Sequence, residues 1–441
     1  MNKRNNSCVI LTSNSMNLSK SFKFKFNIQE KDKRSHARFG ELITPHGIIK
    51  TPAFVPVGTL ASVKSLSPQA LQEMGTQIVL SNTYHLHLRP GEEVVNKTGG
   101  LSRFMNWNGP TMTDSGGYQV FSLGVAQKNI VIKDISGKKL NKFSKSVFLN
   151  RSDSLPLLPS VTKTTEEKQK RRLKSALVND DGVWFYSHLN GNKEWFDAEK
   201  SIKIQEKLGA DLIVAFDDHE SPLWDYETTK LSLERTSRWA ISSLKAHKRN
   251  DQLMYGIVHG GRFEELRKFS AEFTNKYFDA IAIGGSYTSK EVLFQMVSSC
   301  IPYFDEEKPR HLLGIGEIED IFESVYRGMD LFDCVAPTRR ARHGTLFIHP
   351  ENGGNKKNSF TFHITNSKFR TDLQPIDPGC ICYVCQYFTR AYLNHLFLGR
   401  ELLAFQLGTY HNLFFLTTLM HQIRESIVQG NFNLLKTKWL P

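Results

Sequence analysis

Residues 331–344, LFDCVAPTRRARHG, combine an apolar run with a single acid, Asp333, and arginines follow at Arg339, Arg340 and Arg342. A carboxylate at the end of a buried strand can attack an electrophilic carbon, and guanidinium groups beside it can bind phosphates. The same pattern also fits a helix cap followed by a solvated basic loop. The two interpretations predict different surroundings for Asp333, so the rest of the chain has to decide between them.

A second group with chemical potential is a set of closely spaced cysteines. Cys380, Cys382 and Cys385 form a C-x-C-x-x-C motif, and His411 follows it. Three thiolates and one imidazole suit a closed tetrahedral Zn²⁺ site, and so dense a cysteine motif is rare by chance. Because such a site has no open coordination position, the sequence predicts one structural zinc and no metal catalysis. The alternative is a cluster of buried thiols without a metal.

The elements that must position these residues are short apolar runs that alternate with amphipathic segments, as strands alternate with helices. Several runs are almost continuously apolar, which is typical of strands buried on both faces. Eight such strands predict a (β/α)₈ TIM barrel, with a doubly wound parallel sheet as the alternative. The runs are TPAFVPVG (51–58), QIVLSNTY (77–84), PTMTDSGG (110–117), DLIVAFDD (211–218), LMYGIVHGG (253–261), FDAIAIGG (278–285), RHLLGIGE (310–317) and MDLFDCVA (329–336).

Polar residues stand at the carboxyl ends of these runs. In a parallel barrel those ends converge on one face, which is where active sites lie. Any one of the residues could merely cap the next helix, but a whole set aimed at one mouth predicts an active site. The set is Asn82, Asp114, Asp217, Asp218, His259, Gly285, Glu317 and Asp333.

The charge balance concerns the partner of this site. The chain of 441 residues has a formal net charge of +13, which favours a polyanion such as nucleic acid. Most of the excess lies in residues 127–177, where 13 Lys and Arg stand against 4 Asp and Glu. Since this stretch has no hydrophobic period, we expect a flexible basic insertion, either an arm that contacts RNA or a solubilising loop.

Composition also predicts the character of the N-terminal segment, the location and the domain bounds. Residues 1–22 are basic and are interpreted as a flexible leader, with an organellar presequence as the alternative. No apolar run approaches the roughly 18–20 residues of a membrane helix, and the cysteine usage favours a reducing, cytoplasmic location. We expect the barrel over residues 23–419, with a zinc-binding subdomain inserted over 380–411, and a helical tail over 420–441.

Taken together, the motifs resemble those of the tRNA-guanine transglycosylase family, also called queuine tRNA-ribosyltransferases. The resemblance runs from about residue 37 to about residue 419, apart from the insertion. It implies a barrel with an inserted zinc subdomain, a homodimer, and neither ATP nor a redox cofactor. It also implies that guanine at wobble position 34 of tRNAs with a GUN anticodon is exchanged for a 7-deazaguanine base, in queuosine modification. The motifs are TPHGIIKTPAFVPVGT, LSNTYHL, TDSGGYQV, LGADLIVAFDD, LLGIG, FDCVAPTR and the C-x-C-x-x-C…His set.

The resemblance also implies a role for each site residue. Asp333 corresponds to the nucleophile of a double displacement, and Asp114 to the general acid/base. Asp217 corresponds to the acid that reads the N1–H and N2–H₂ donors of the base. The base-binding residues implied are Asp114, Tyr118, Asp217, His259, Gly285 and Leu313, and the tRNA-binding residues implied are Arg339 and Arg342.

Three departures from the family pattern line the predicted base pocket. His219 stands where bacterial relatives usually have Cys, His259 where they have Gln, and residues 286–290 replace Leu-Ala-Val-Gly-Glu. The missing acid at Lys290 weakens the case for the base preQ1, so preQ1 and queuine both remain open. Buried core roles are the alternative for the two histidines.

Two other classes of protein share part of this pattern. A non-catalytic partner subunit would lack the catalytic acids, whereas this chain keeps both. A barrel hydrolase acting on a sugar would explain the two acids, but not the zinc motif, the basic balance or the arginine cluster.

Overall fold

The computed structural model describes residues 23–118, 176–187, 189–285 and 287–441. The expected leader, Ser286 and residues 127–175 of the expected insertion lie outside these ranges. The last two residues of the expected insertion, 176 and 177, belong to a strand, β7 (Ala176–Val178).

Eight parallel strands form the centre of the fold, in the order β4-β14-β13-β12-β11-β10-β6-β5. A parallel bridge between Val57 and Leu80 joins the two ends of this sheet, so it closes into a barrel. Each strand lies within one of the eight predicted runs, and the (β/α)₈ barrel is confirmed over the open sheet. The strands are β4 (Ala53–Pro56), β5 (Val79–Ser81), β6 (Thr111–Thr113), β10 (Leu212–Val214), β11 (Leu253–Val258), β12 (Ala280–Ile283), β13 (Arg310–Leu312) and β14 (Leu331–Cys334).

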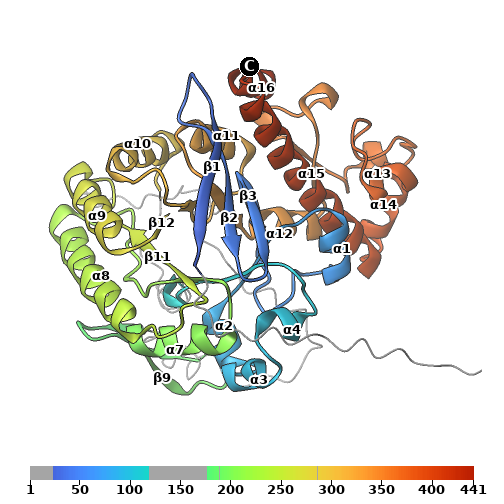
Figure 1. The fold of residues 1–441 in the computed structure, drawn as a ribbon. Helices are drawn as coiled ribbons and strands as arrows, with labels where there is room; N and C mark the ends of the chain where they lie inside the picture. The colour runs from blue at the N-terminus through green and yellow to red at the C-terminus, as the bar shows by residue number, and fades with distance from the viewer. Residues whose placement is uncertain (1–22, 119–175, 188, 286) are drawn as a thin grey trace, which may run out of the picture.

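Helices follow the strands and surround the barrel (Figure 1). Several begin at a side-chain cap: Asp225 accepts from the Thr228 backbone N–H at 2.9 Å at the start of α8. The helices are α1 (Pro68–Glu73), α2 (Thr83–Leu88), α3 (Glu92–Lys97), α4 (Leu101–Met105), α7 (Ala198–Leu208), α8 (Tyr226–Ala246), α9 (Glu264–Tyr277), α10 (Lys290–Cys300), α11 (Ile318–Tyr326) and α12 (Ala336–Arg342).

An antiparallel sheet of β1 (Lys25–Lys31), β2 (Arg38–Thr44) and β3 (Gly47–Thr51) covers the amino end of the barrel. The buried Arg38 Nε donates to Asp330 Oδ1 at 2.9 Å, just before β14 begins. His46 Nδ1 lies 2.8 Å from Asp211 Oδ1, just before β10 begins. These contacts fix the sheet to the end opposite the predicted active site.

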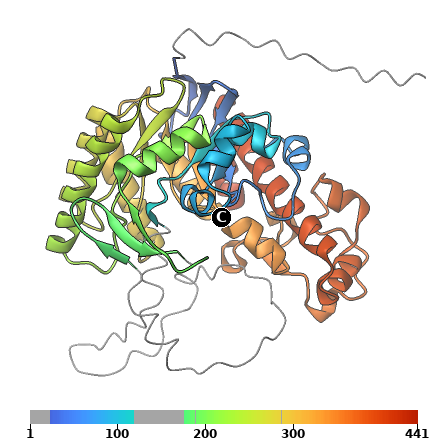
Figure 2. The same ribbon diagram turned by 90° about the horizontal axis from the view of Figure 1, so that it is seen from below.

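A second antiparallel sheet interrupts the barrel rhythm between β6 and α7. It consists of β7, β8 (Val183–Tyr186) and β9 (Lys193–Phe196). Since it follows the end of β6, it belongs to the carboxyl face of the barrel, and Figure 2 shows it on the opposite flank from the C-terminal helices.

A subdomain with its own hydrophobic cluster follows α12. It contains the pair β15 (Thr345–Phe347) and β16 (Thr361–His363), and the helices α13 (Tyr383–Tyr387) and α14 (Arg390–Leu398). Helix α15 (Leu402–Val428) leaves the subdomain and packs on α12 and β4, and it continues without a break past residue 420, where the helical tail is expected to begin. The last helix is α16 (Phe432–Trp439). Among the described residues, no helix combines the length and the apolar character needed to cross a bilayer.

Candidate functional site

Asp333 lies on β14 at the carboxyl end of the barrel, with a side chain that is 14% exposed. Its Oδ1 accepts hydrogen bonds from His311 Nε2 at 3.0 Å and from the Gly314 N–H at 3.2 Å. Helix α12 has Val335 at its N-cap and no side-chain cap bond, so the capping interpretation of Asp333 does not hold. Two donors hold Oδ1, and Oδ2 has no hydrogen bond among the described residues and is available to react.

Asp114 follows β6 at the same end of the barrel. Its Oδ1 accepts from the Thr83 N–H at 2.8 Å, and its Oδ2 accepts from the Asn82 side-chain amide. Burial nevertheless raises the pKa of Asp114 to about 7, and the charge of Asp333 adds to this rise. The carboxyl group can therefore take up or give away a proton near neutral pH, as a general acid/base must. The electrostatic effect of Asp333 on Asp114 also indicates that the two acids share one site.

Asp217, just beyond β10, is buried and fully held by neighbouring side chains. Its Oδ1 accepts from Ser115 Oγ at 2.8 Å, and its Oδ2 lies 2.9 Å from His259 Nε2. Burial alone would raise the pKa of Asp217, but the hydrogen bond and the charge of His259 lower it below the usual value. The same contact, with a second one from Glu220, raises the pKa of His259 to about 9 against the effect of burial. Asp217 is thus an ionised acceptor, which suits the N1–H and N2–H₂ edge of a guanine.

Three further predicted base-binding residues lie around these acids. Gly285 follows β12 with φ of +112°, and a Cβ there would come within 2.8 Å of Glu220 Oε1, so only glycine fits. Leu313 follows β13 and packs against the hydrophobic cluster inside the barrel. Tyr118 is 41% exposed and its ring meets the His219 ring edge-on at 4.8 Å. Tyr118 thus offers an accessible aromatic surface beside His219.

The arginines after Asp333 have different surroundings. Arg340 pairs with Glu317 at the start of α11, so its charge is neutralised by an acid of the protein itself. Arg342 Nη1 donates to the Thr338 carbonyl at 2.9 Å. Arg339 is partly exposed and makes no ion pair within the described part of the chain. The predicted pair Arg339 and Arg342 lies on a short helix, α12, that begins directly after β14.

Some polar strand ends serve structure, and some site residues were not singled out from the sequence. Asn82 caps α2 through its side chain, besides holding Asp114. His311 and Glu220 contact the predicted nucleophile and the predicted base pocket, respectively, yet neither was a candidate. The available signal for His311 was a histidine next to the apolar residues of a predicted strand, in the run RHLLGIGE.

The four predicted metal ligands come together in the subdomain. The Sγ atoms of Cys380, Cys382 and Cys385 lie 3.9, 3.5 and 3.4 Å from His411 Nδ1. A tetrahedral ion about 2.3 Å from sulfur and about 2.0 Å from nitrogen implies S···N separations of about 3.5 Å, so the cluster fits a metal ion. His411 Nε2 donates to the Phe347 carbonyl at 2.9 Å, which orients the ring for ligation through Nδ1.

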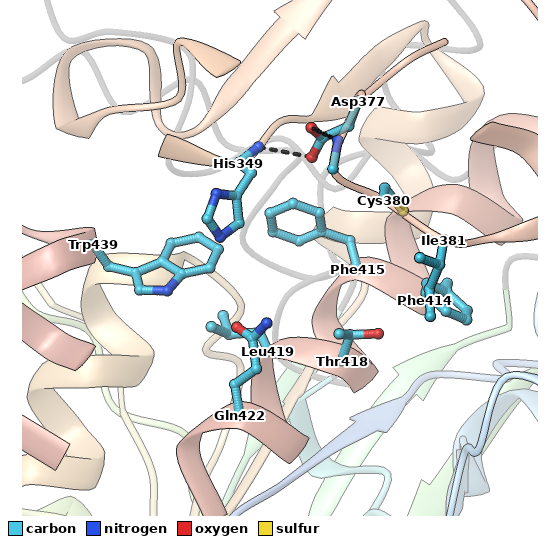
Figure 3. A pocket seen from close by; sticks show the side chains of 11 residues that line it. His349, Asp377, Cys380, Ile381, Phe414, Phe415, Thr418, Leu419, Gln422 and Trp439 are labelled. Atoms are coloured by element: carbon cyan, nitrogen blue, oxygen red, sulfur yellow. Dashed lines mark hydrogen bonds between the residues drawn. The ribbon is translucent and has the colours of Figure 1, made fainter. Parts of the chain in front are cut away.

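A small hollow borders this cluster (Figure 3). Asp377 lies on one side, where its Oδ2 accepts from the His349 N–H at 2.9 Å and its carbonyl accepts from the Cys380 N–H at 3.0 Å. Phe415 and Trp439 from the C-terminal helices form much of the remaining wall. No predicted catalytic or base-binding residue lines the hollow, and Asp377 serves to position the loop that carries the cysteines.

Comparison with known proteins agrees with this geometry. The family model described as Queuine tRNA-ribosyltransferase matches residues 32–153 and 159–441. A putative queuine tRNA-ribosyltransferase of Archaeoglobus fulgidus is 44% identical over 405 residues, covering 91% of this chain and 96% of the relative. Queuine tRNA-ribosyltransferases of Roseiflexus sp. and Aquifex aeolicus are 40% and 41% identical, over 94% and 95% of this chain and 98% of each relative. This chain belongs to the queuine tRNA-ribosyltransferase family.

Proposed function

We propose that this protein is a tRNA-guanine transglycosylase that exchanges guanine at wobble position 34 of GUN-anticodon tRNAs for a 7-deazaguanine base. The observation that carries the proposal is the pair of acids at the barrel mouth. One has an oxygen available to react, and the other has a pKa of about 7. A non-catalytic partner subunit would need neither.

The reaction follows as two displacements at C1′ of the ribose. Asp333 Oδ2 attacks C1′ as the bond to guanine breaks, and protonated Asp114 gives its proton to the departing base. Asp114 then takes a proton from the incoming base, which attacks C1′ and releases the Asp333 carboxylate. Two inversions retain the configuration, as in retaining glycosidases. No oxidant, reductant or nucleotide is consumed.

Recognition divides between the base and the tRNA. Asp217 accepts from the base edge, with Gly285 and His259 beside it, and Tyr118 and Leu313 lie against its faces. Arg339 and Arg342 bind the anticodon nucleotides, since a guanidinium fits both phosphates and base edges.

The identity of the incoming base depends on the segment after β12. Lys290 Nζ pairs with Glu319 at 2.6 Å and Asp320 at 3.1 Å on α11. Position 290 therefore carries an amine that binds acids of α11, and it offers no acid to the base pocket. Competition of unlabelled preQ1 and queuine against labelled guanine decides between the two bases.

We further propose that the subdomain binds Zn²⁺ as a structural ion and that the protein is a homodimer. Three thiolates and an imidazole form the usual donor set of structural zinc. The subdomain also exposes large apolar side chains, with Ile381 and Tyr387 at 71% and Leu402 at 76%. Light scattering on the native protein and on Tyr387→Lys tests whether this face joins two copies.

Asp333→Asn tests the central proposal. The variant should bind GUN-anticodon tRNA like wild type, but incorporate no labelled guanine and form no enzyme–RNA adduct on a denaturing gel. Exchange at a rate near that of wild type would exclude Asp333 as the nucleophile.

A further inference from the structure

Glu220 is a buried carboxylate beside the base pocket to which neither the reaction nor the family motifs assign a task. Its side chain is 1% exposed. Its Oε2 accepts from the Gly260 N–H at 2.9 Å, and its Oε1 accepts from the Gly261 N–H at 2.7 Å. These are the two glycines that follow His259 at the end of β11. Glu220 therefore fixes the turn that carries His259.

The partner of Glu220 is Arg267 on α9, which is completely buried. Arg267 Nη2 donates to Glu220 Oε1 at 2.8 Å, and Nη1 donates to the carbonyls of Val258 at 3.0 Å and Gly284 at 3.1 Å. The guanidinium thus joins the ends of β11 and β12, directly before His259 and Gly285. The same two side chains occupy the space where a Cβ on Gly285 would lie.

Glu220 also faces the second nitrogen of His259. The distance from His259 Nδ1 to Glu220 Oε1 is 3.7 Å, and the buried Nδ1 has no hydrogen-bond partner among the described residues. The other nitrogen, Nε2, contacts Asp217. One imidazole therefore lies between two carboxylates, and Asp217, Glu220, His259 and Arg267 form a buried group of two acids and two cations.

We propose that Glu220 is a positioning residue of the base pocket, which holds His259 as a double donor so that Asp217 stays an acceptor for the donor edge of the base. This rests on the proposed function and assigns the pocket to purines that offer both N1–H and a 2-amino group, guanine and its 7-deaza analogues. Hypoxanthine, which lacks the 2-amino group, would leave one Asp217 acceptor unused.

The surrounding charges are consistent with this role. Burial would lower the pKa of His259, but its hydrogen bond to Asp217 and the nearby carboxylate of Glu220 raise it to about 9. Glu220 keeps a pKa of about 2 despite its burial, because Arg267 and His259 stabilise its charge. Asp218 is paired with Arg235, and burial together with the charge of His259 lowers the pKa of His219 to about 4. The neutral His219 leaves His259 as the protonated histidine of the pocket.

Glu220→Gln tests the proposal through the pH dependence of base binding. Without the second acid, His259 loses its proton at a lower pH, and its positive charge then no longer stabilises the ionised Asp217. The ratio of the variant's KM for guanine to that of wild type should therefore rise about tenfold between pH 6.5 and pH 8.5, with KM for tRNA unchanged. Glu264→Gln, the same change at an exposed position of α9, is the matched control and should leave the ratio near one.

Two more variants make the outcome decisive. In a His259→Gln background, Glu220→Gln should alter KM for guanine by a factor independent of pH. Glu220→Asp keeps the charge and should keep the wild-type pH profile, and it decides the question if Glu220→Gln does not fold. A constant KM ratio in folded Glu220→Gln, or a tenfold rise that persists without His259, would overturn the proposal. A wild-type protein without guanine exchange would instead overturn the proposed function itself.

Discussion

The contact between His311 and the predicted nucleophile leads to a prediction about the rate of each half-reaction. His311→Phe removes the donor to Asp333 Oδ1 and keeps a ring in the buried space, where His311 meets Tyr255 edge-on at 6.0 Å. The Gly314 N–H would remain as the one donor to that oxygen among the described residues.

The expected size of the effect follows from the bond that is lost. A hydrogen bond to a charged group contributes about 1.5–3 kcal/mol, which corresponds to about 10- to 150-fold in rate. The donor matters most when the carboxylate leaves C1′ and its negative charge returns. We therefore expect the second displacement to slow more than the first, so that the covalent enzyme–RNA adduct accumulates.

The assay is a denaturing gel of enzyme mixed with tRNA, together with steady-state incorporation of labelled guanine. His311→Phe should lower kcat by about 10- to 150-fold, leave KM for tRNA unchanged and increase the adduct band. His311→Gln, which can still donate near the former Nε2, should restore much of the rate. Tyr255→Phe is the control, because it removes a buried hydroxyl beside the same ring that, in the described part of the chain, has no hydrogen-bond partner.

Two results would refute this reasoning. An unchanged kcat in His311→Phe would show that Gly314 alone holds Asp333. An equal loss in Tyr255→Phe would show that the effect is one of packing and not of the donor.

Three further predictions concern protonation, metal and stability. Formation of the covalent adduct should fall as pH rises through about 7, the pKa of Asp114, because the departing guanine needs the protonated acid; a rate independent of pH between 6 and 8.5 would contradict this. Cys382→Ser should lose the bound metal and lower the melting temperature, measured by metal analysis and calorimetry, whereas Cys300→Ser, at a buried cysteine outside the cluster, should keep the metal. The hydrogen bond to Asp211 raises the pKa of His46, so the protonated histidine stabilises the fold at low pH. His46→Gln should therefore destabilise the fold most below about pH 6, by less than about 1 kcal/mol, and the difference should vanish as pH rises through the raised pKa. Equal differences in thermal melts at pH 5.5 and 8.5 would exclude this linkage.

The elements that the sequence predicted well are those with a local signature. Each barrel strand is a short apolar run, and the metal ligands Cys380, Cys382 and Cys385 are close neighbours in the chain. Asp333 and Asp114 could be singled out because each follows a buried run at a motif position. In these cases the residue type and its immediate neighbours contain the information.

The contacts that the sequence did not reveal join residues that are distant in the chain. His311 reaches Asp333 across neighbouring strands, and Arg267 reaches Glu220 from a helix, so neither pair has a fixed spacing. Among the arginines of α12, Arg340 is assigned a structural role by its pairing with Glu317, which the sequence does not reveal. Such distinctions depend on tertiary packing, which composition and periodicity do not encode.

Helix α15 links the metal cluster to the helix that carries the arginines. Next to His411, Asn412 Nδ2 donates to the carbonyl of Pro337, in the first turn of α12, at 3.0 Å and to that of Thr345, at the start of β15, at 3.1 Å. A chain that has lost its metal would therefore release α12 by local opening while the barrel stays folded, and the amides of α12 would exchange with solvent first. Metal occupancy would then control the order of α12: a chain without the metal keeps both carboxylates in place, but the arginines of α12 are no longer held rigidly beside them.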